Sequence, residues 1–509
     1  MALEDWFAPA TALPGAAGVR TRRVSSGQWL QAAHDFAAAN GRLLALWASG
    51  GPGAGSVRAA LAANAGVLVT ELPLSAAGYP GLGDVFPAAG RMQRAVFDLN
   101  GAVCTDADRR PWLRHAAWPA DFHPLQDGVP APEAEPLRHD DYAFVRVEGE
   151  GVHEIPVGPV HAGIIEPGHF RFSVVGEKVL RLEERLGYTH KGIERRFTEM
   201  PLLEAHRLAA RVSGDSAAAF SWAYAQALEG LAGIEAPVRA AWLRALCLEL
   251  ERIANHLGDL GALGNDAGFA FGLAQFSRLK EQLLRANEQA FGQRYLLDTI
   301  VPGGLRADLE PSGTACLRGC VAGIAAELPR LREVYDEQAG LRDRFVGAGR
   351  VPAQLAQRLG LCGLAGRASG QAFDVRVDVP CVPYGELAAR RCGSTDGDVA
   401  ARVTVRFEEL CESFRLVQCI LDGLPSGVHR IAVPLPPAGG LGLGLIEGWR
   451  GPVLLALEPG AGGAIRRCHP HDPSWQNWPV LEHAIIDNIV PDFPLINKSF
   501  NLSYSGADL

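Results

Sequence analysis

Residues 238–262 read VRAAWLRALCLELERIANHLGDLGA, and this stretch decides how the second part of the chain folds. Its apolar residues recur at steps of three, four, three, four and three: Leu243, Leu246, Leu250, Ile253, Leu257 and Leu260. Such steps place side chains on one face of a helix with 3.6 residues per turn. Pro237 precedes the stretch, and proline suits a helix's first turn. The pattern therefore predicts a long helix with one apolar face packed in a bundle.

Outward from this helix, the periodicity predicts more helices at 176–187, 198–230, 273–292, 313–346 and 397–421. Strand-like runs lie before them, YAFVRVEGEGVHEIPVGP at 142–159 and HFRFSVVG at 169–176. From about Gly444 the pattern returns to strands and loops, and the apolar, glycine-rich segment 441–463 reads as buried strands and turns. We therefore expect a helical bundle flanked by small β-sheets.

The first 125 residues have a pattern of their own. Residues 27–40 read as a short amphipathic helix closed by Gly41, and 43–47 and 66–72 read as strands. The following residues, 126–140, are rich in proline, glycine and acids, which is typical of a linker. The predicted fold class is α+β, with a small α/β domain at 1–125, a linker at 126–140 and a larger domain at 141–509.

Composition excludes several classes of protein. Of the 509 residues, 48% are apolar and 21% charged, which excludes a fully disordered chain. The net charge of −9 offers no general attraction to nucleic acid. No run of about 18 apolar residues is present to span a bilayer. The ten cysteines include no C-x-x-C pair, and no signal peptide is recognised, so a reducing compartment is expected.

The densest group of polar residues lies at 158–195. It contains His161, Glu166, His169, His190 and Glu194. Histidine titrates near neutral pH and burial raises the pKa of glutamate, so the group could transfer protons. It could also bind a metal ion, or consist only of hydrogen-bonded structural residues. Spacing alone leaves these three interpretations open.

This segment resembles the start of the large catalytic subunit of energy-converting [NiFe]-hydrogenases, and equally the 49-kDa subunit of respiratory complex I. The resemblance continues through RVSGDS (211–216), 248–261, 397–417, IEGWRG (446–451) and DFPLINKSFNLSYSGADL (492–509). Residues 86–101 are similar to the 30-kDa subunit of complex I. The chain thus resembles a fusion of both subunits, as in hydrogenase-4-like and formate-hydrogenlyase-like complexes.

The sequence departs from this family where the metal would be held. [NiFe]-hydrogenases hold nickel and iron with four thiolates from two C-x-x-C pairs, because soft sulfur favours such metals. The matching positions here are Ser213, Ser216, Ser503 and Gly506. The resemblance therefore implies a nickel–iron site that has lost its ligands, and no metal or other cofactor is expected on this chain. Binding of nickel or NAD would be assigned to this chain only because its relatives bind them. The glycine-rich segment 53–60 lacks the strand–turn–helix pattern of a dinucleotide-binding site.

Residues that surround the metal in the family are partly retained. Glu166 matches a glutamate that passes protons from the metal, and Glu194 matches a carboxylate that serves a second metal ion in some hydrogenases. Arg450 matches the arginine above the active site, although Trp449 replaces the usual proline. Arg450 could equally form a structural ion pair with a carboxylate.

In complex I, the corresponding cavity holds a quinone headgroup against a histidine and a tyrosine. His169 lies near the matching histidine, and the tyrosine position reads Arg211. Tyr188, Tyr224 and Tyr504 are alternatives for the tyrosine. A quinone is therefore the small ligand that the resemblance implies, with a departure at Arg211.

Three functional hypotheses follow from the resemblance. The first is a subunit, without its own nickel–iron centre, of a hydrogenase-like or NADH:quinone-oxidoreductase-like complex that couples electron transfer to ion translocation. Its site would be a cavity around the following residues: His161, Glu166, His169, Glu194, Arg211 and Arg450. The second is a catalytically silent scaffold. The third, a working hydrogenase, is disfavoured by the missing thiolates.

The expected partners are an iron–sulfur small subunit, which carries the clusters, and the subunits of a membrane arm. The expected location is peripheral, at the cytoplasmic face of the inner (plasma) membrane. Partner contacts rather than charge would hold it there, because the chain is acidic overall.

Overall fold

The structure is a computed structural model that describes residues 3–106, 108–115, 118–119, 121–126, 142–159 and 165–509. The predicted linker, apart from its first residue, and His161 lie outside these ranges. The domain boundaries therefore stay a prediction.

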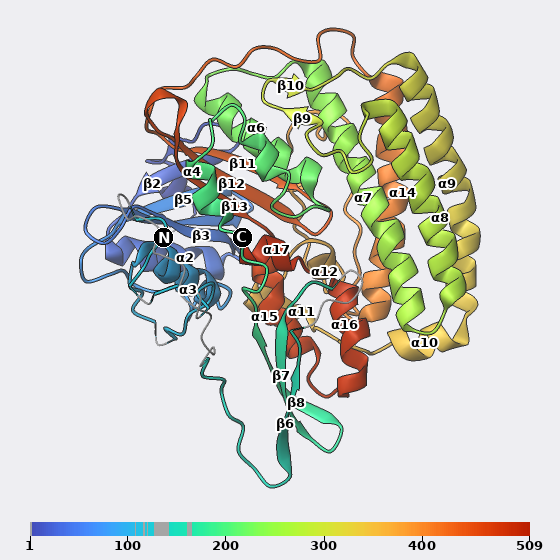
Figure 1. Ribbon diagram of the computed structural model, residues 1–509, viewed down its shortest axis with the longest axis horizontal. Helices are drawn as coiled ribbons and strands as arrows, with labels where there is room; N and C mark the ends of the chain where they lie inside the picture. Colours follow the sequence, from blue (N-terminus) through green and yellow to red (C-terminus); the bar gives the residue numbers. More distant parts are fainter. Residues whose placement is uncertain (1–2, 107, 116–117, 120, 127–141, 160–164) are drawn as a thin grey trace.

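The N-terminal part is a five-stranded sheet with helices on one face (Figure 1). Its strand order is β1 (Thr11–Ala12), β2 (Val19–Arg23), β5 (Gly66–Pro73), β4 (Ser56–Ala63), β3 (Arg42–Ser49), and only β2 and β5 pair in parallel. The helices are α1 (Glu4–Phe7), α2 (Ser26–Ala38) and α3 (Ala89–Asn100). The helix expected at 27–40 and the strands at 43–47 and 66–72 are confirmed. Ser25 and Gln28 form a capping box that starts α2.

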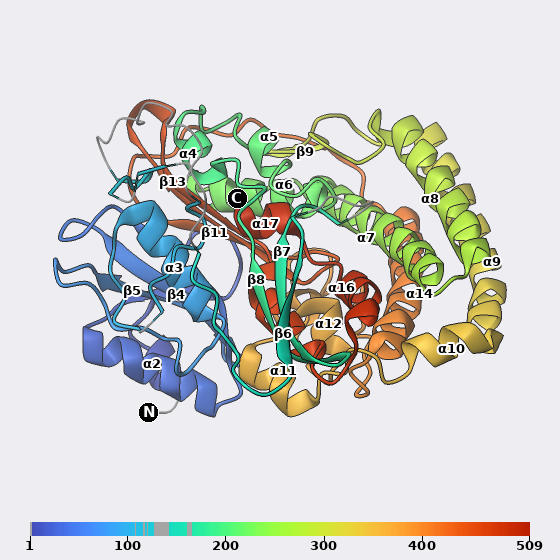
Figure 2. The same cartoon turned by 60° about the horizontal axis from the view of Figure 1, so that its bottom comes forward.

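The opposite face of this sheet packs on a second sheet, β11 (Gly442–Glu447), β12 (Pro452–Pro459) and β13 (Ile465–His471). Trp47 and Val69 from the first sheet share one apolar cluster with Leu443 and Leu454 from the second. Helix α6 (Ala217–Leu231) packs on β11 and β12 as well. The N-terminal part therefore shares a core with the rest of the chain. Figure 2 shows its sheet lying beside β11 and β13.

The predicted bundle is present. It consists of α7 (Val238–Asp266), α8 (Ala270–Phe291), α9 (Pro311–Glu337) and α14 (Val399–Gly423), which lie side by side in both views. These helices confirm the predictions for 238–262, 273–292, 397–421 and most of 313–346, which α10 (Ala339–Phe345) completes. All six apolar residues of the predicted stripe are fully buried.

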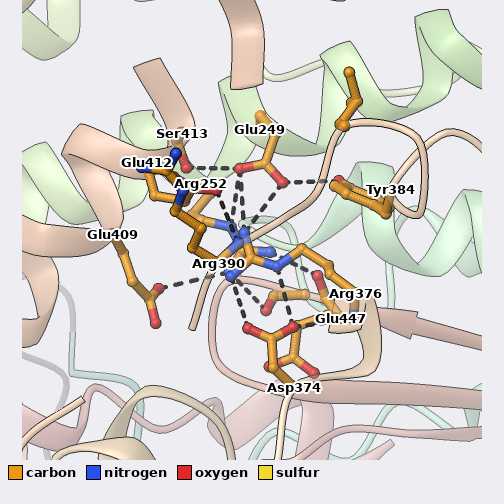
Figure 3. A network of polar contacts seen from close by, with 12 residues as sticks. Glu249, Arg252, Asp374, Arg376, Tyr384, Arg390, Glu409, Glu412, Ser413 and Glu447 are labelled. Carbon is orange, nitrogen blue, oxygen red and sulfur yellow. Dashed lines mark hydrogen bonds and ion pairs between the residues drawn. The ribbon is translucent and has the colours of Figure 1, made fainter. Parts of the chain in front are cut away.

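Most charged residues of α7 are buried too, because other elements surround the helix: Arg244, Glu249, Glu251, Arg252 and Asp259. Figure 3 shows Glu249 at the centre of a buried network. It accepts hydrogen bonds from Tyr384 Oη (2.7 Å) and Ser413 Oγ (2.6 Å), and it pairs with Arg252 and Arg376, each at 3.3 Å. These five residues tie α7 to α14 and to the segment around α13 (Val375–Asp378).

Two expectations about secondary structure were wrong. Residues 176–187 are not a helix: β7 (His169–Val175) and β8 (Lys178–Arg185) form a hairpin with β6 (Val152–Val157) along the other edge of β7. A two-residue turn with Gly176 at φ 60° joins them, and such a turn brings the strands back antiparallel. The region after β13 is helical rather than strands and loops, with α15 (Ser474–Ala484), α16 (Phe493–Phe500) and α17 (Tyr504–Asp508).

The predicted helix 198–230 is interrupted. The chain forms α4 (Ile193–Thr198), α5 (His206–Ala209) and then α6, with loops between them. The remaining elements are short: β9 (Ile300–Val301), β10 (Gly304–Leu305), α11 (Ala353–Leu359), α12 (Gly363–Arg367), η1 (Ala461–Gly463) and η2 (Val490–Asp492). No helix among the described residues is long and apolar enough to cross a membrane.

Candidate functional site

The two segments that match the hydrogenase ligand motifs meet in space. Ser213 lies in the loop before α6, and Ser503 is the N-cap residue of α17. Their Oγ atoms are 2.8 Å apart. The Ser213 hydroxyl also donates to Asp215 Oδ1 at 2.8 Å, and Ser503 Oγ accepts the backbone N–H of Gly506 at 2.9 Å. Hydrogen bonds thus join the two segments, with each hydroxyl both donating and accepting.

Gly506 has no space for a side chain. A Cβ atom built there would lie 2.7 Å from Cγ of Asp472, well inside van der Waals contact. Asp472 is fully buried; its Oδ1 accepts the backbone N–H of Ser474 at 2.8 Å, and its Oδ2 has no hydrogen-bond partner among the described residues. Burial raises the pKa of Asp472, although the Arg450 guanidinium opposes this. The carboxyl group therefore occupies the place that a longer residue at 506 would need.

Arg450 forms the ion pair that the sequence left as an alternative. Its guanidinium donates to both oxygens of Asp215, at 2.7 and 2.5 Å, and stacks on Trp449 with its Cζ 4.0 Å from the ring centre. It also lies 3.5 Å from Ser216 Oγ. Burial alone would raise the pKa of Asp215, but the charge of Arg450 lowers it below its ordinary value. This bidentate pair directly borders Ser213, Ser216 and Ser503, which are called the serine cluster below.

Glu166 adjoins the same cluster from the β7 side. It accepts the backbone N–H of Ser505 at 3.0 Å and also the Ser505 hydroxyl. Ser505 is two residues from Ser503, so Glu166 contacts the same segment as the serine pair. Its carboxylate is only partly buried.

Glu194 lies elsewhere and has an internal cation. It is 2% exposed and pairs with Arg467 at 2.8 Å and with His469 Nδ1 at 2.6 Å. Burial favours the neutral form, but Arg467 and then His469 outweigh it and lower the pKa of Glu194 to about 2. The Arg467 guanidinium therefore balances the charge of the Glu194 carboxylate.

Besides Glu194, two more predicted residues are not brought to this cluster. Arg211 is half-exposed and pairs with Asp298 at 2.6 Å. His169 bonds through Nδ1 to the backbone oxygen of Gly158 at 3.0 Å and lies 3.4 Å from Arg171 Nε. His161 lies outside the described residues.

The alternative tyrosines also differ in position. Tyr504 follows Ser503 directly and accepts a hydrogen bond from Asn497 at 3.2 Å. Tyr224 is buried and donates to the backbone oxygen of Leu202 at 2.6 Å, while Tyr188 is partly exposed at the surface. Of the three, only Tyr504 is adjacent in sequence to the serine cluster.

Sequence reasoning missed Asp215 and Asp472. Asp215 lies between two serines of the RVSGDS motif, and its negative charge is the signal that could have indicated a partner for Arg450. Asp472 is far from either motif in sequence, so no local pattern points to it. No three His, Cys, Asp or Glu side chains in the described ranges lie close enough together to hold a metal ion.

Comparison with known proteins yields consistent relatives. Residues 266–437 match the family described as the 49-kDa subunit of respiratory-chain NADH dehydrogenase. The chain is 32% identical to formate hydrogenlyase subunit 5 of Escherichia coli over 439 residues, which cover 84% of this chain and 77% of that protein. It is 30% identical to hydrogenase-4 component G of Escherichia coli, covering 84% and 76%. Both matches are too long to lie within 141–509 alone, so they reach the N-terminal part.

One solved structure is also similar. It belongs to the membrane-bound sulfane sulfur reductase, an archaeal respiratory membrane complex. The TM-score is 0.67 at 25% sequence identity, and the match covers 71% of this chain and 99% of that one.

Proposed function

This chain belongs to the superfamily of [NiFe]-hydrogenase large subunits and complex I 49-kDa subunits, and we propose that, unlike the hydrogenases, it works without a nickel–iron centre. In this proposal it is a peripheral subunit at the cytoplasmic face of a membrane oxidoreductase complex. Electrons would pass through an iron–sulfur partner subunit, and their transfer would be coupled to ion translocation by a membrane arm. In support, one relative is a subunit of formate hydrogenlyase, and the similar solved structure belongs to an archaeal respiratory membrane complex.

The contact between Ser213 and Ser503 carries this proposal. At neutral pH serine hydroxyls keep their protons, and their oxygen is a hard ligand, so they do not replace bridging thiolates. The one donor hydrogen of each hydroxyl is used: Ser213 donates to Asp215 and Ser503 donates to Ser213, while Ser503 accepts the Gly506 backbone N–H. Gly506 supplies no ligand atom at all. These residues do not fit a nickel–iron centre, and no reaction step is assigned to one.

The ion pair of Arg450 and Asp215 favours a working site over an empty fold. Arg450 is buried while Asp215 is about one-third exposed, so removing Asp215 would leave a buried guanidinium without its carboxylate, which is costly. The pair, Glu166 and Asp472 place three carboxylates around the serine cluster, a suitable arrangement for holding and passing protons. In this proposal a quinone bound to the assembled complex would be the electron acceptor.

A specific observation favours the scaffold alternative. Arg211, at the position of the quinone-contacting tyrosine, is turned to the surface and paired with Asp298. In that alternative, the complex would need this chain for assembly but not for turnover.

One experiment separates the two functions. A tagged chain would be purified from native membranes after a high-salt wash, with Asp215→Asn compared against the control Asp298→Asn, which breaks an exposed ion pair. The proposal expects co-purification of an iron–sulfur subunit with all variants and loss of electron transfer only with Asp215→Asn. Equal electron transfer in all variants would establish the scaffold, and recovery as a lone soluble chain would contradict both.

A further inference from the structure

A cavity of about 250 Å³ lies beside the serine cluster, on its bundle side. Helices α7 and α8 and the segments around 214–215 and 294–297 form its walls. Carbon atoms of Ala254, Leu284, Leu296 and Leu297 line much of it. Drug-sized ligands usually occupy pockets of about 300–1,000 Å³, so this one suits a single-ring molecule.

The cavity contains a cation without a direct partner. Lys280 of α8 is partly buried, and its ammonium group makes no hydrogen bond or ion pair with any residue that the structure describes. It lies near enough to Asp215 to help lower the pKa of that carboxyl, but Asp215 is already bound bidentately by Arg450. Burial raises the pKa of Glu251, also in the wall, to about 8, so this group stays mostly neutral at pH 7.

The other cation of the wall is already paired. Arg294 bonds to Glu281 at 2.5 Å, outside the cavity lining. Lys280 therefore leaves the cavity with one positive charge available to a ligand. A single carboxylate would satisfy it with charge-assisted hydrogen bonds.

The cavity also contains an unsatisfied acceptor. Asn287 is 1% exposed and donates through Nδ2 to the backbone oxygen of Arg294 at 3.2 Å. Its Oδ1 atom is buried and has no hydrogen-bond partner within the described part of the chain. Buried acceptors without partners cost free energy, so Oδ1 is ready for a donor on a ligand.

Lys280 and Asn287 are seven residues apart on α8. Seven residues are close to two helical turns, so both residues lie on one face of α8 with their Cα atoms about 10.5 Å apart along the axis. An aromatic ring with a carboxylate and a hydroxyl at opposite ends, extended by one hydrogen bond at each end, has a similar length. The leucines would contact the ring.

We propose that this cavity binds a single-ring aromatic monocarboxylate that carries a hydroxyl group. The carboxylate lies at Lys280, the hydroxyl donates to Asn287 Oδ1, and the ring lies among Leu284, Leu296 and Leu297. This inference does not rest on the proposed redox function, because it uses only the shape, charge and hydrogen-bonding capacity of the cavity.

Calorimetric titration of the full chain with 4-hydroxybenzoate tests this proposal. Benzoate lacks the hydroxyl, and 4-methylphenol lacks the carboxylate. Lys280→Gln removes the cation of the cavity. Arg285→Gln is the matched control, because it removes one charge from the same helix at a side chain that is 73% exposed. Asn287→Leu removes the acceptor.

Saturable binding of 4-hydroxybenzoate at one site is expected, with weaker binding of both truncated compounds. Lys280→Gln should weaken it at least about tenfold, because a hydrogen bond to a charged group contributes strongly. Arg285→Gln should leave it unchanged, and Asn287→Leu should affect 4-hydroxybenzoate but not benzoate. The proposal is overturned by no saturable binding to the unmodified chain, by equal binding to Lys280→Gln, or by equal losses in Lys280→Gln and Arg285→Gln.

Discussion

The hydroxyl groups of Ser213 and Ser503 lie 2.8 Å apart although 290 positions separate them in the sequence. One precedes α6 and the other caps α17, so this contact joins two segments that are far apart in the chain. Hydrogen bonds between side chains hold these two segments together. The stability of this region should therefore depend on the serines themselves.

Ser213→Ala should destabilise the protein by about 1–3 kcal/mol, because the buried hydroxyl of Ser503 loses its acceptor. Ser503→Ala should cost more than Ser213→Ala, since it also removes a helix N-cap. Denaturant unfolding of the unmodified protein, the two single variants and the double variant gives the coupling free energy between the two serines. A coupling of at least about 0.5 kcal/mol is expected for residues in contact; additive effects would contradict a direct bond.

Gly506→Ala should destabilise the protein by about 1–3 kcal/mol, as overpacking of a well-packed site does. The added Cβ would lie 2.7 Å from Asp472 Cγ. Gly214→Ala is the control: it lies in the matching motif, and nothing is within 4 Å of its added Cβ. Thermal unfolding compares the two, and equal midpoints would show that position 506 has room for a side chain.

Glu251 should make stability fall as pH rises. Burial raises the pKa of Glu251 from 4.5 to about 8 in the folded protein. Between these values the unfolded chain has released a proton that the folded chain keeps, so a rise in pH favours unfolding. Glu251→Gln does not titrate, and its stability should fall less from pH 5 to pH 8 than that of the unmodified protein. Urea unfolding at several pH values measures this. If the free energies of unfolding of both proteins change with pH in parallel, Glu251 is not the group with the raised pKa.

The buried network in Figure 3 should be far more sensitive than surface ion pairs. Glu249→Ala leaves Arg252 and Arg376 without a shared carboxylate and should cost about 3–5 kcal/mol. Glu281→Ala breaks two exposed pairs, with Arg285 on α8 and with Arg294 just after α8, and should cost about 1 kcal/mol or less. Denaturant unfolding of both variants tests the difference, and similar losses would show that the network adds nothing beyond surface pairing.

The sequence alone predicts the secondary structure correctly where one physical effect dominates. The apolar steps from Leu243 to Leu260 predicted α7, because burial of a helix face repeats every 3.6 residues. The hairpin at 169–185 was missed because Val179, Leu182 and Leu186 also fit helical spacing. The turn glycine, Gly176, was the signal that could have corrected it.

The candidate site was only partly predictable from sequence. Motif matching brought Ser213, Ser503 and Arg450 together, and the structure places all three in one cluster. It could not find Asp472, because a contact between distant segments depends on tertiary packing rather than on local pattern. Likewise, Arg211 matched a ligand position in sequence, yet its long charged side chain turns outward to Asp298.

Nickel analysis of the complex, purified from its native host and treated with a chelator, tests the central claim most directly. The measurement would use mass spectrometry of the metal, normalised to the amount of this chain. With Ser213, Ser216, Ser503 and Gly506 at the ligand positions, we predict no stoichiometric nickel. One nickel per chain that survives chelation would contradict the account.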